Sequence, residues 1–143
     1  MNEFDEQHNR IVEALGGATI PEVNLENLEK YRDFLEVHIE FPCYLTGIED
    51  FDWEEFYVLG PGDEEEYEEL KKTRPSYTDI FEFIGFHEML TETRGIFANV
   101  QRKSDGKKFE LPLADLKATD KKSQNYQLLH DFSVWLINYY HCQ

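Results

Sequence analysis

Acidic side chains crowd one stretch of this 143-residue chain. Between Glu49 and Glu69 the sequence carries eleven Asp and Glu residues and neither Lys nor Arg. Carboxylates at this density repel one another, and the repulsion destabilises the folded chain unless a cation or a basic partner offsets it. The chemistry that this segment offers is therefore the recognition of positive charge.

The charge of the whole chain limits its partners. Asp and Glu number 30 against 14 Lys and Arg, which gives a formal net charge of -16 and a pI near 4.6. Binding to nucleic acid depends on Lys and Arg displacing counterions from phosphates, so the balance argues against a nucleic-acid binder. It argues equally against docking on an anionic membrane leaflet.

The first half of the acidic stretch alternates carboxylates with aromatic rings. The carboxylates are Glu49, Asp50, Asp52, Glu54 and Glu55. If the rings pack inward, these acids can converge outside, where Ca²⁺ would find the roughly six to eight oxygen ligands it takes. An EF-hand does not fit, because Glu55 stands where its Gly is required and Pro61 where its last Glu is required. The alternative is an exposed acidic loop with no ligand.

Three further acids can be interpreted either as metal ligands or as residues that stabilise local structure. Asp63 and Glu66 could bind a cation, but their spacing is also that of a capping box at the start of a short acidic helix. Asp79 could reach the same loop if the strand that follows it runs antiparallel to the preceding strand. Alternatively, Ser76 and Asp79 shape the turn that enters that strand.

The elements expected around these acids belong to an α+β protein. Apolar residues at helical spacing predict helices over 4–15 and 25–39, the second capped by Asn24. Alternating β-branched and aromatic residues predict five strands, at Cys43–Ile48, Thr78–Phe86, Gly95–Arg102, Lys107–Leu113 and Phe132–Asn138. The third and fourth are joined by Ser104-Asp105-Gly106, where Gly106 can take a positive φ, so we expect a hairpin whose two strands each alternate apolar residues on one face. We expect one domain, in which N-terminal helices (1–40) precede a small SH3-like antiparallel β-barrel (41–143) with the acidic helix in its long first loop.

Other classes of protein find little support in the sequence. The two cysteines can form at most one disulfide, the first residues do not resemble a signal peptide, and no apolar run is long enough to span a bilayer. These features predict a soluble, cytoplasmic protein, expected to be a monomer. The five histidines are scattered, and no nucleophile, base and orienting group can be named together, so we expect no enzyme.

Several segments together resemble a family of cyanobacterial calcium-binding proteins, whose founding member influences heterocyst differentiation. They are Phe41–Phe51, Trp53–Glu55, Pro75–Asp79, Leu111–Leu116, Asn125–Gln127 and Ser133–Trp135. The resemblance implies a cytoplasmic Ca²⁺ buffer or sensor without EF-hands, with two sites of unequal strength, linked to nitrogen-starvation signalling. It places Glu49, Asp50, Glu54, Glu55 and Asp79 on motif positions. Asp52, Asp63 and Glu66 remain candidate ligands from their charge alone.

A second hypothesis stays open beside calcium binding. The acidic face could belong to an interaction module that docks a basic protein or mimics nucleic acid toward a DNA-binding protein. The macromolecular partner expected for this protein is a basic protein or a regulatory protease. Docking through charge would weaken steeply with salt and would discriminate little among divalent ions.

Overall fold

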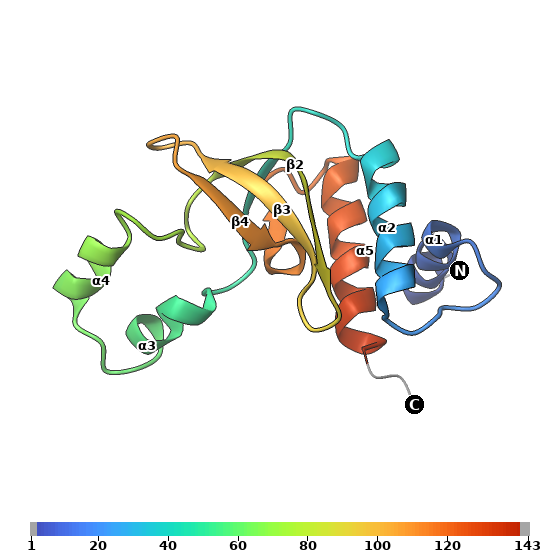
Figure 1. The fold of residues 1–143 in the computed structure, drawn as a ribbon, viewed down its shortest axis with the longest axis horizontal. Helices are drawn as coiled ribbons and strands as arrows, with labels where there is room; N and C mark the ends of the chain where they lie inside the picture. Colours follow the sequence, from blue (N-terminus) through green and yellow to red (C-terminus); the bar gives the residue numbers. More distant parts are fainter. Residues whose placement is uncertain (1–2, 141–143) are drawn as a thin grey trace.

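The computed structural model describes residues 3–140 and has an α+β fold (Figure 1). Three longer helices lie on one side of a sheet, and two short ones form a lobe at the opposite end of the molecule. The longer helices are α1 (Glu3–Leu15), α2 (Leu25–His38) and α5 (Gln124–Asn138), and the short ones are α3 (Glu55–Val58) and α4 (Glu64–Leu70). None of the helices within 3–140 combines the length and apolar character needed to cross a membrane.

The sheet has five strands in the order β4-β3-β2-β1-β5, and every neighbouring pair is antiparallel. The strands are β1 (Tyr44–Gly47), β2 (Phe81–Thr91), β3 (Gly95–Arg102), β4 (Lys108–Pro112) and β5 (Leu116–Ala118). The antiparallel α+β class is as predicted. The closed SH3-like barrel is not formed, because β4 and β5 remain two open edges of the described sheet.

The last expected strand, Phe132–Asn138, is wrong, since these residues form the second half of α5. Leu129, Phe132 and Leu136 are spaced to share one helical face, and all three are buried. Ser123 caps the helix by accepting a hydrogen bond from the Tyr126 N–H at 3.2 Å. The fifth strand is instead the three-residue β5, which is too short to show a sequence alternation.

The packing of α2 against α5 places the largest aromatic residues in the core. Asn24 caps α2 as predicted, with its side chain accepting from the Asn27 N–H at 2.8 Å. The buried ring of Tyr31 then lies 5.1 Å from the ring of Phe132 and 5.2 Å from that of Trp135. Such aromatic pairs stabilise the interface between the two helices by more than the burial of their apolar surface alone would.

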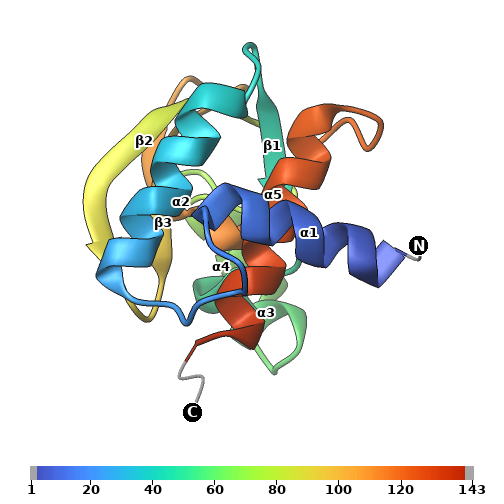
Figure 2. The ribbon, with the colours of Figure 1, turned by 90° about the vertical axis from the view of Figure 1, so that its right-hand side faces the viewer.

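Helix α1 lies across α2 and α5 on the side away from the sheet (Figure 2). A two-pronged ion pair fixes it there: Arg10 Nε donates to Asp131 Oδ2 at 2.7 Å, and Nη2 donates to Oδ1 at 3.1 Å. Asp131 lies on α5 and is only 3% exposed. A buried carboxylate with this bidentate partner holds the outer helix in a defined position.

The hairpin between β3 and β4 forms where it was predicted. Gly106 adopts a φ of +78° in the turn, a conformation that favours glycine. Ala98 pairs with Leu111 and Val100 with Phe109, so the predicted apolar faces of the two strands coincide. The long connection between β1 and β2 carries the lobe and the whole of the acidic stretch.

Candidate functional site

Glu54 is the most buried of the predicted ligands, with no exposed surface. Its Oε2 accepts from the backbone N–H groups of Phe51 at 3.1 Å and Tyr77 at 2.9 Å. Its Oε1 accepts from the hydroxyls of Ser76 at 2.6 Å and Tyr67 at 2.8 Å. Burial and the bond to this carboxylate raise the pKa of Tyr67 to about 12. Four donors occupy both oxygens, so Glu54 anchors the lobe to the chain that enters β2.

Asp79 is held in a second polar cluster. Its Oδ2 accepts from the Ser76 N–H at 2.8 Å and from Nη1 of the buried Arg102 at 3.0 Å. Arg102 also donates to Asp105, a bond that lowers the pKa of Asp105 to about 2. Its guanidinium further donates to the carbonyl oxygens that follow α4, those of Lys71, Lys72 and Arg74. Asp79 therefore shapes the turn before β2, as the structural alternative predicted.

Asp63 and Glu66 stabilise the lobe from within. Asp63 caps α4 by accepting from the Glu66 N–H at 3.0 Å, while the Glu66 carboxylate accepts from the Tyr57 hydroxyl at 3.0 Å. The rings of Tyr57 and Tyr67 stack with their centroids 5.3 Å apart, and this contact joins α3 to α4. Glu55 lies exposed on α3. These acids form a charged helical surface of the lobe.

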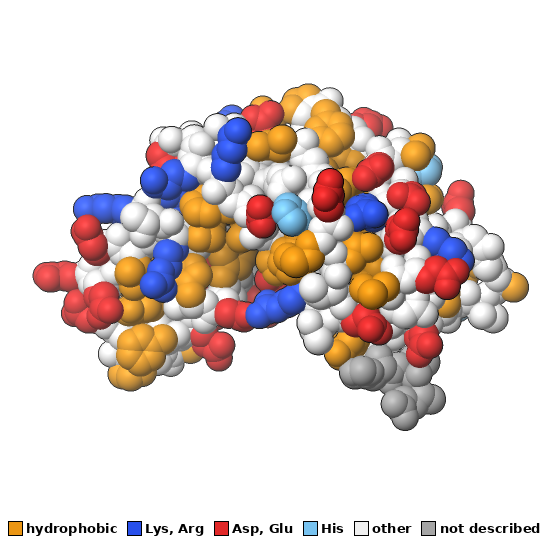
Figure 3. Space-filling view, in the orientation of Figure 1, with side chains coloured by type: hydrophobic (Ala, Val, Ile, Leu, Met, Phe, Trp, Pro, Cys, Tyr) orange, Lys and Arg blue, Asp and Glu red, His pale blue; other side chains and the backbone are white. Residues whose placement is uncertain are grey.

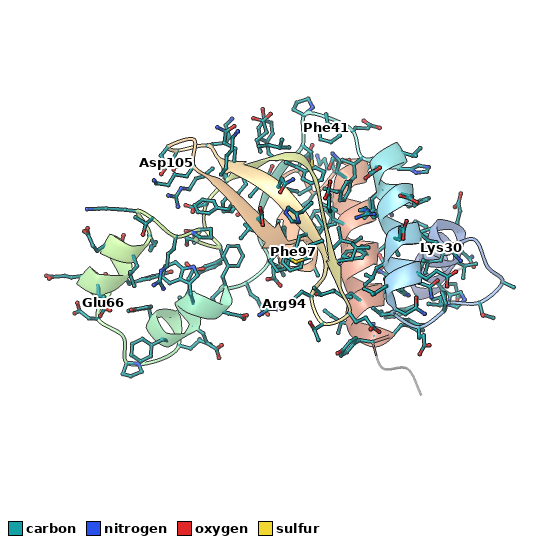
Figure 4. The ribbon with its side chains drawn as sticks, viewed as in Figure 1. Lys30, Phe41, Glu66, Arg94, Phe97 and Asp105 are labelled. Carbon is teal, nitrogen blue, oxygen red and sulfur yellow. The ribbon has the colours of Figure 1, made fainter. Side chains whose placement is uncertain are left out.

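The remaining predicted ligands, Glu49, Asp50 and Asp52, line one cleft of about 560 Å³. It lies between the loop after β1, the turn between β2 and β3, the short 3₁₀ helix η2 (Leu113–Asp115) and the end of α5. Figure 3 shows the molecule hollowed at this place, and Figure 4 labels Arg94 at its mouth. Arg94 Nη2 lies 2.7 Å from Asp52 Oδ2.

Asp115 adds a fourth carboxylate to the cleft, and the sequence interpretation missed it. Burial raises its pKa, the nearby charges of Asp52 and Glu49 raise it further, and Arg94 opposes them. The Asp115 carbonyl accepts from the Ile48 N–H at 2.9 Å, which brings η2 beside the acidic loop. Asp115 stands alone in a part of the chain where bases outnumber acids, so no local charge pattern marks it.

The carboxylates line the cleft, but they are not arranged around a single point as the ligands of a bound metal ion are. Among residues 3–140, no three Asp, Glu, His or Cys side chains are already placed to hold one metal ion. Arg94 is the only Lys or Arg among the described residues that line the cleft, against four acids. Four carboxylates against one guanidinium make the described lining of the cleft electronegative, and their oxygen atoms are of the kind that hard cations prefer.

The chain matches no protein-family model, and comparisons with the curated proteins and the solved structures find no significant similarity. The described residues form an α+β protein whose open antiparallel sheet carries an acidic cleft beside its first strand. The chemistry of that cleft is the basis for assigning a function.

Proposed function

We propose that the protein binds Ca²⁺ in the cleft formed by Glu49, Asp50, Asp52 and Asp115. The observation that carries the proposal is the meeting of four carboxylates from two distant segments around one space, with a single guanidinium among its lining residues. Hard oxygen ligands select hard cations. Burial, and to a smaller extent the charges of Asp52 and Glu49, raise the pKa of Asp115, and a divalent ion bound here would favour its ionised form instead.

The ion would bind by drawing these side chains together. The carboxylates offer up to eight oxygens, and a Ca²⁺ ion takes about six to eight at flexible geometry. Mg²⁺ is bound less readily by a set of this kind, because it keeps several waters and demands octahedral geometry. Arg94 contacts Asp52 through Oδ2, so a bound ion would compete with this guanidinium for the carboxylate.

The biological role belongs to the same proposal. The segments that resemble the cyanobacterial calcium-binding proteins include the loop that lines the cleft, which supports a buffer or sensor of calcium in heterocyst signalling. The affinity then lies in the sensor range, with a Kd of about 10⁻⁷ to 10⁻⁵ M. A second, weaker site is expected among the exposed acids of the lobe. The buried, free thiol of Cys43 supports a reducing, cytoplasmic location.

Titration calorimetry with Ca²⁺ and with Mg²⁺ tests the proposal. With Ca²⁺, at tens of micromolar protein, we expect a saturable heat signal, either exothermic or endothermic. The affinity for Mg²⁺ should be at least tenfold weaker. Asp50→Asn and Asp115→Asn should each weaken the tighter site about tenfold or more, whereas Asp33→Asn on the exposed face of α2 should not. No saturable binding of Ca²⁺, or equal affinity for both ions, would overturn the proposal.

A further inference from the structure

A second cleft, of about 550 Å³, lies where α1, α2 and the start of α5 meet. Among the described residues, none lines both this cleft and the calcium cleft. Its charged lining residues are three bases, Arg10, Lys121 and Lys122, and two acids, Glu13 and Asp131. This balance is the reverse of that of the whole chain, whose net charge is -16. Cavities of this size hold small organic molecules.

The two lysines leave positive charge available in this cleft. Neither of their ammonium groups forms an ion pair with an acid of residues 3–140. Asp131, by contrast, is already neutralised by Arg10 and accepts a further bond from Gln7 Nε2 at 3.1 Å. Physiological salt screens charges more than about 8 Å apart, so an anion here responds to the lysines rather than to the acidic lobe at the far end of the molecule.

The cleft also reaches a buried hydroxyl that has no partner. Tyr31 is only 1% exposed and lines the cleft, yet its hydroxyl makes no hydrogen bond within the described part of the chain. Every described side-chain N or O atom that is closed off from solvent does have a partner, so this hydroxyl is the part of Tyr31 that opens into the cleft. Burial and the charge of Asp131 raise the pKa of Tyr31, so the hydroxyl keeps its proton. It can therefore donate to an acceptor that a ligand supplies.

A pair of stacked rings forms one wall of the cleft. Phe34 and His38 lie one turn apart on α2, and their ring centroids are 4.1 Å apart. His38 Nδ1 donates to the Phe34 carbonyl oxygen at 2.8 Å, which holds the second ring in place. Leu128 of α5 adds an apolar side chain to the same cleft. Rings arranged in this way offer a surface on which a flat ligand can stack.

The first turn of α5 supports the recognition of an anion. Ser123 caps this 15-residue helix, and both Ser123 and Gln124 line the cleft. The backbone N–H groups at the start of a helix, together with its dipole, favour a negative group. They add to the free lysines and to the Tyr31 hydroxyl, all of which are donors.

We propose that this cleft binds a small organic phosphate that carries a flat ring, of the size of a nucleoside monophosphate. The phosphate would accept from Lys121, Lys122 and the first turn of α5, and the ring would lie against Phe34 and His38. Two ammonium groups match a dianion, which favours a phosphate over a carboxylate. A nucleic-acid polymer remains disfavoured, because its further phosphates would meet the acidic surface outside the cleft. The proposal does not rest on calcium binding.

Titration calorimetry in EDTA at pH 7 tests the proposal independently of calcium. The probes are the four nucleoside monophosphates of RNA, and the references are the matching nucleosides and inorganic phosphate. We expect at least one nucleotide to bind with a Kd below about 1 mM. It should bind about tenfold or more tightly than its nucleoside and than inorganic phosphate. Raising the salt from about 50 to about 300 mM should weaken the binding.

Two pairs of lysine variants test the charge. Lys121→Gln with Lys122→Gln should weaken nucleotide binding about tenfold or more, because it removes both free ammonium groups from the cleft. The control is Lys107→Gln with Lys108→Gln, which removes the same charge at the β3–β4 hairpin and should change the affinity by less than about twofold. Thermal melts confirm that each variant is folded.

Tyr31→Phe tests the hydroxyl while it keeps the buried ring. We expect nucleotide binding to weaken about tenfold, as for the loss of a hydrogen bond to a charged group. The melting temperature without ligand should not fall, since the hydroxyl has no partner to lose. The control Tyr44→Phe on β1 should leave the affinity unchanged. A hydroxyl with a merely structural role would instead lower the melting temperature and leave binding intact.

Several outcomes would overturn this proposal. One is that none of the four nucleotides binds, and another is that the nucleoside binds as tightly as its nucleotide, because the phosphate would then not be recognised. Inorganic phosphate that binds as tightly as the nucleotide would exclude the stacked ring. Equal losses in the two pairs of lysine variants would show that only net charge matters.

Discussion

The guanidinium of Arg94, in the turn between β2 and β3, lies 2.7 Å from the carboxylate of Asp52, in the loop after β1. Both side chains are at least half exposed, so this ion pair stands at the mouth of the cleft rather than within the core. Such an exposed pair contributes about 0.2 to 1 kcal/mol. Arg94 is thus a weakly held cation beside the cleft, and the proposed divalent ion would compete with it for Asp52.

Arg94→Gln is expected to raise the affinity of the cleft for Ca²⁺, because the ion no longer competes with the guanidinium for Asp52. The gain should be up to about fivefold, the equivalent of one exposed ion pair. Calorimetry of the variant and the wild type measures it. The control is Arg32→Gln, which also removes one positive charge but lies where Arg32 donates to the Glu88 carbonyl. Equal effects of the two variants would show that only net charge matters.

Asp115→Asn is expected to stabilise the protein in EDTA at neutral pH while it weakens calcium binding. Burial raises the pKa of Asp115 above its unfolded value, so ionisation is less favourable in the folded state and costs stability at pH 7. The advantage of the variant should shrink as the pH falls and the wild-type carboxyl becomes protonated. Thermal melts from pH 7 to 4 check this. Melting temperatures that are equal at pH 7 would contradict the assignment.

Glu54→Ala is expected to destabilise the protein by about 3 kcal/mol, because it leaves buried N–H and hydroxyl donors without an acceptor. Glu54→Gln should cost less than about 1 kcal/mol. Its amide oxygen can accept from Phe51 and Tyr77, and its NH₂ can donate to the hydroxyls of Ser76 and Tyr67, which rotate. Urea unfolding at pH 7 measures both. A matched Glu66→Ala, which loses one exposed bond, should cost little; large equal losses in all three would contradict this account.

Part of the protein's stability depends on the ionised form of Asp105 and is therefore lost at acidic pH. The bond from Arg102 lowers its pKa to about 2, below its value in the unfolded chain of 3.8. Its contribution is therefore complete above pH 4 and is lost as the pH falls toward 2. The difference in melting temperature between wild type and Asp105→Asn should narrow over that interval. A difference that stays constant from pH 6 to 2 would show that the Arg102 contact does not depend on the charge.

Local signals predicted much of the fold. The caps at Asn24 and Asp63 and the positive φ of Gly106 depend on neighbours a few residues away, and the structure confirms all three. The end of the chain was misread because Phe132–Asn138 is rich in residues that favour strands. Its burial on α5, against Tyr31 of α2, overrides that preference.

The order of residues along the chain shows that negative charge is concentrated after the first strand, which points to a positive ion or a basic partner. Which of these acids remain available to bind one depends on how the chain folds. Glu54 and Asp79 are taken by hydrogen bonds from Tyr77 and Arg102, whereas Asp115 arrives from the other half of the chain. The reason is that a carboxylate's partners are set by packing between distant segments, which spacing along the chain does not encode.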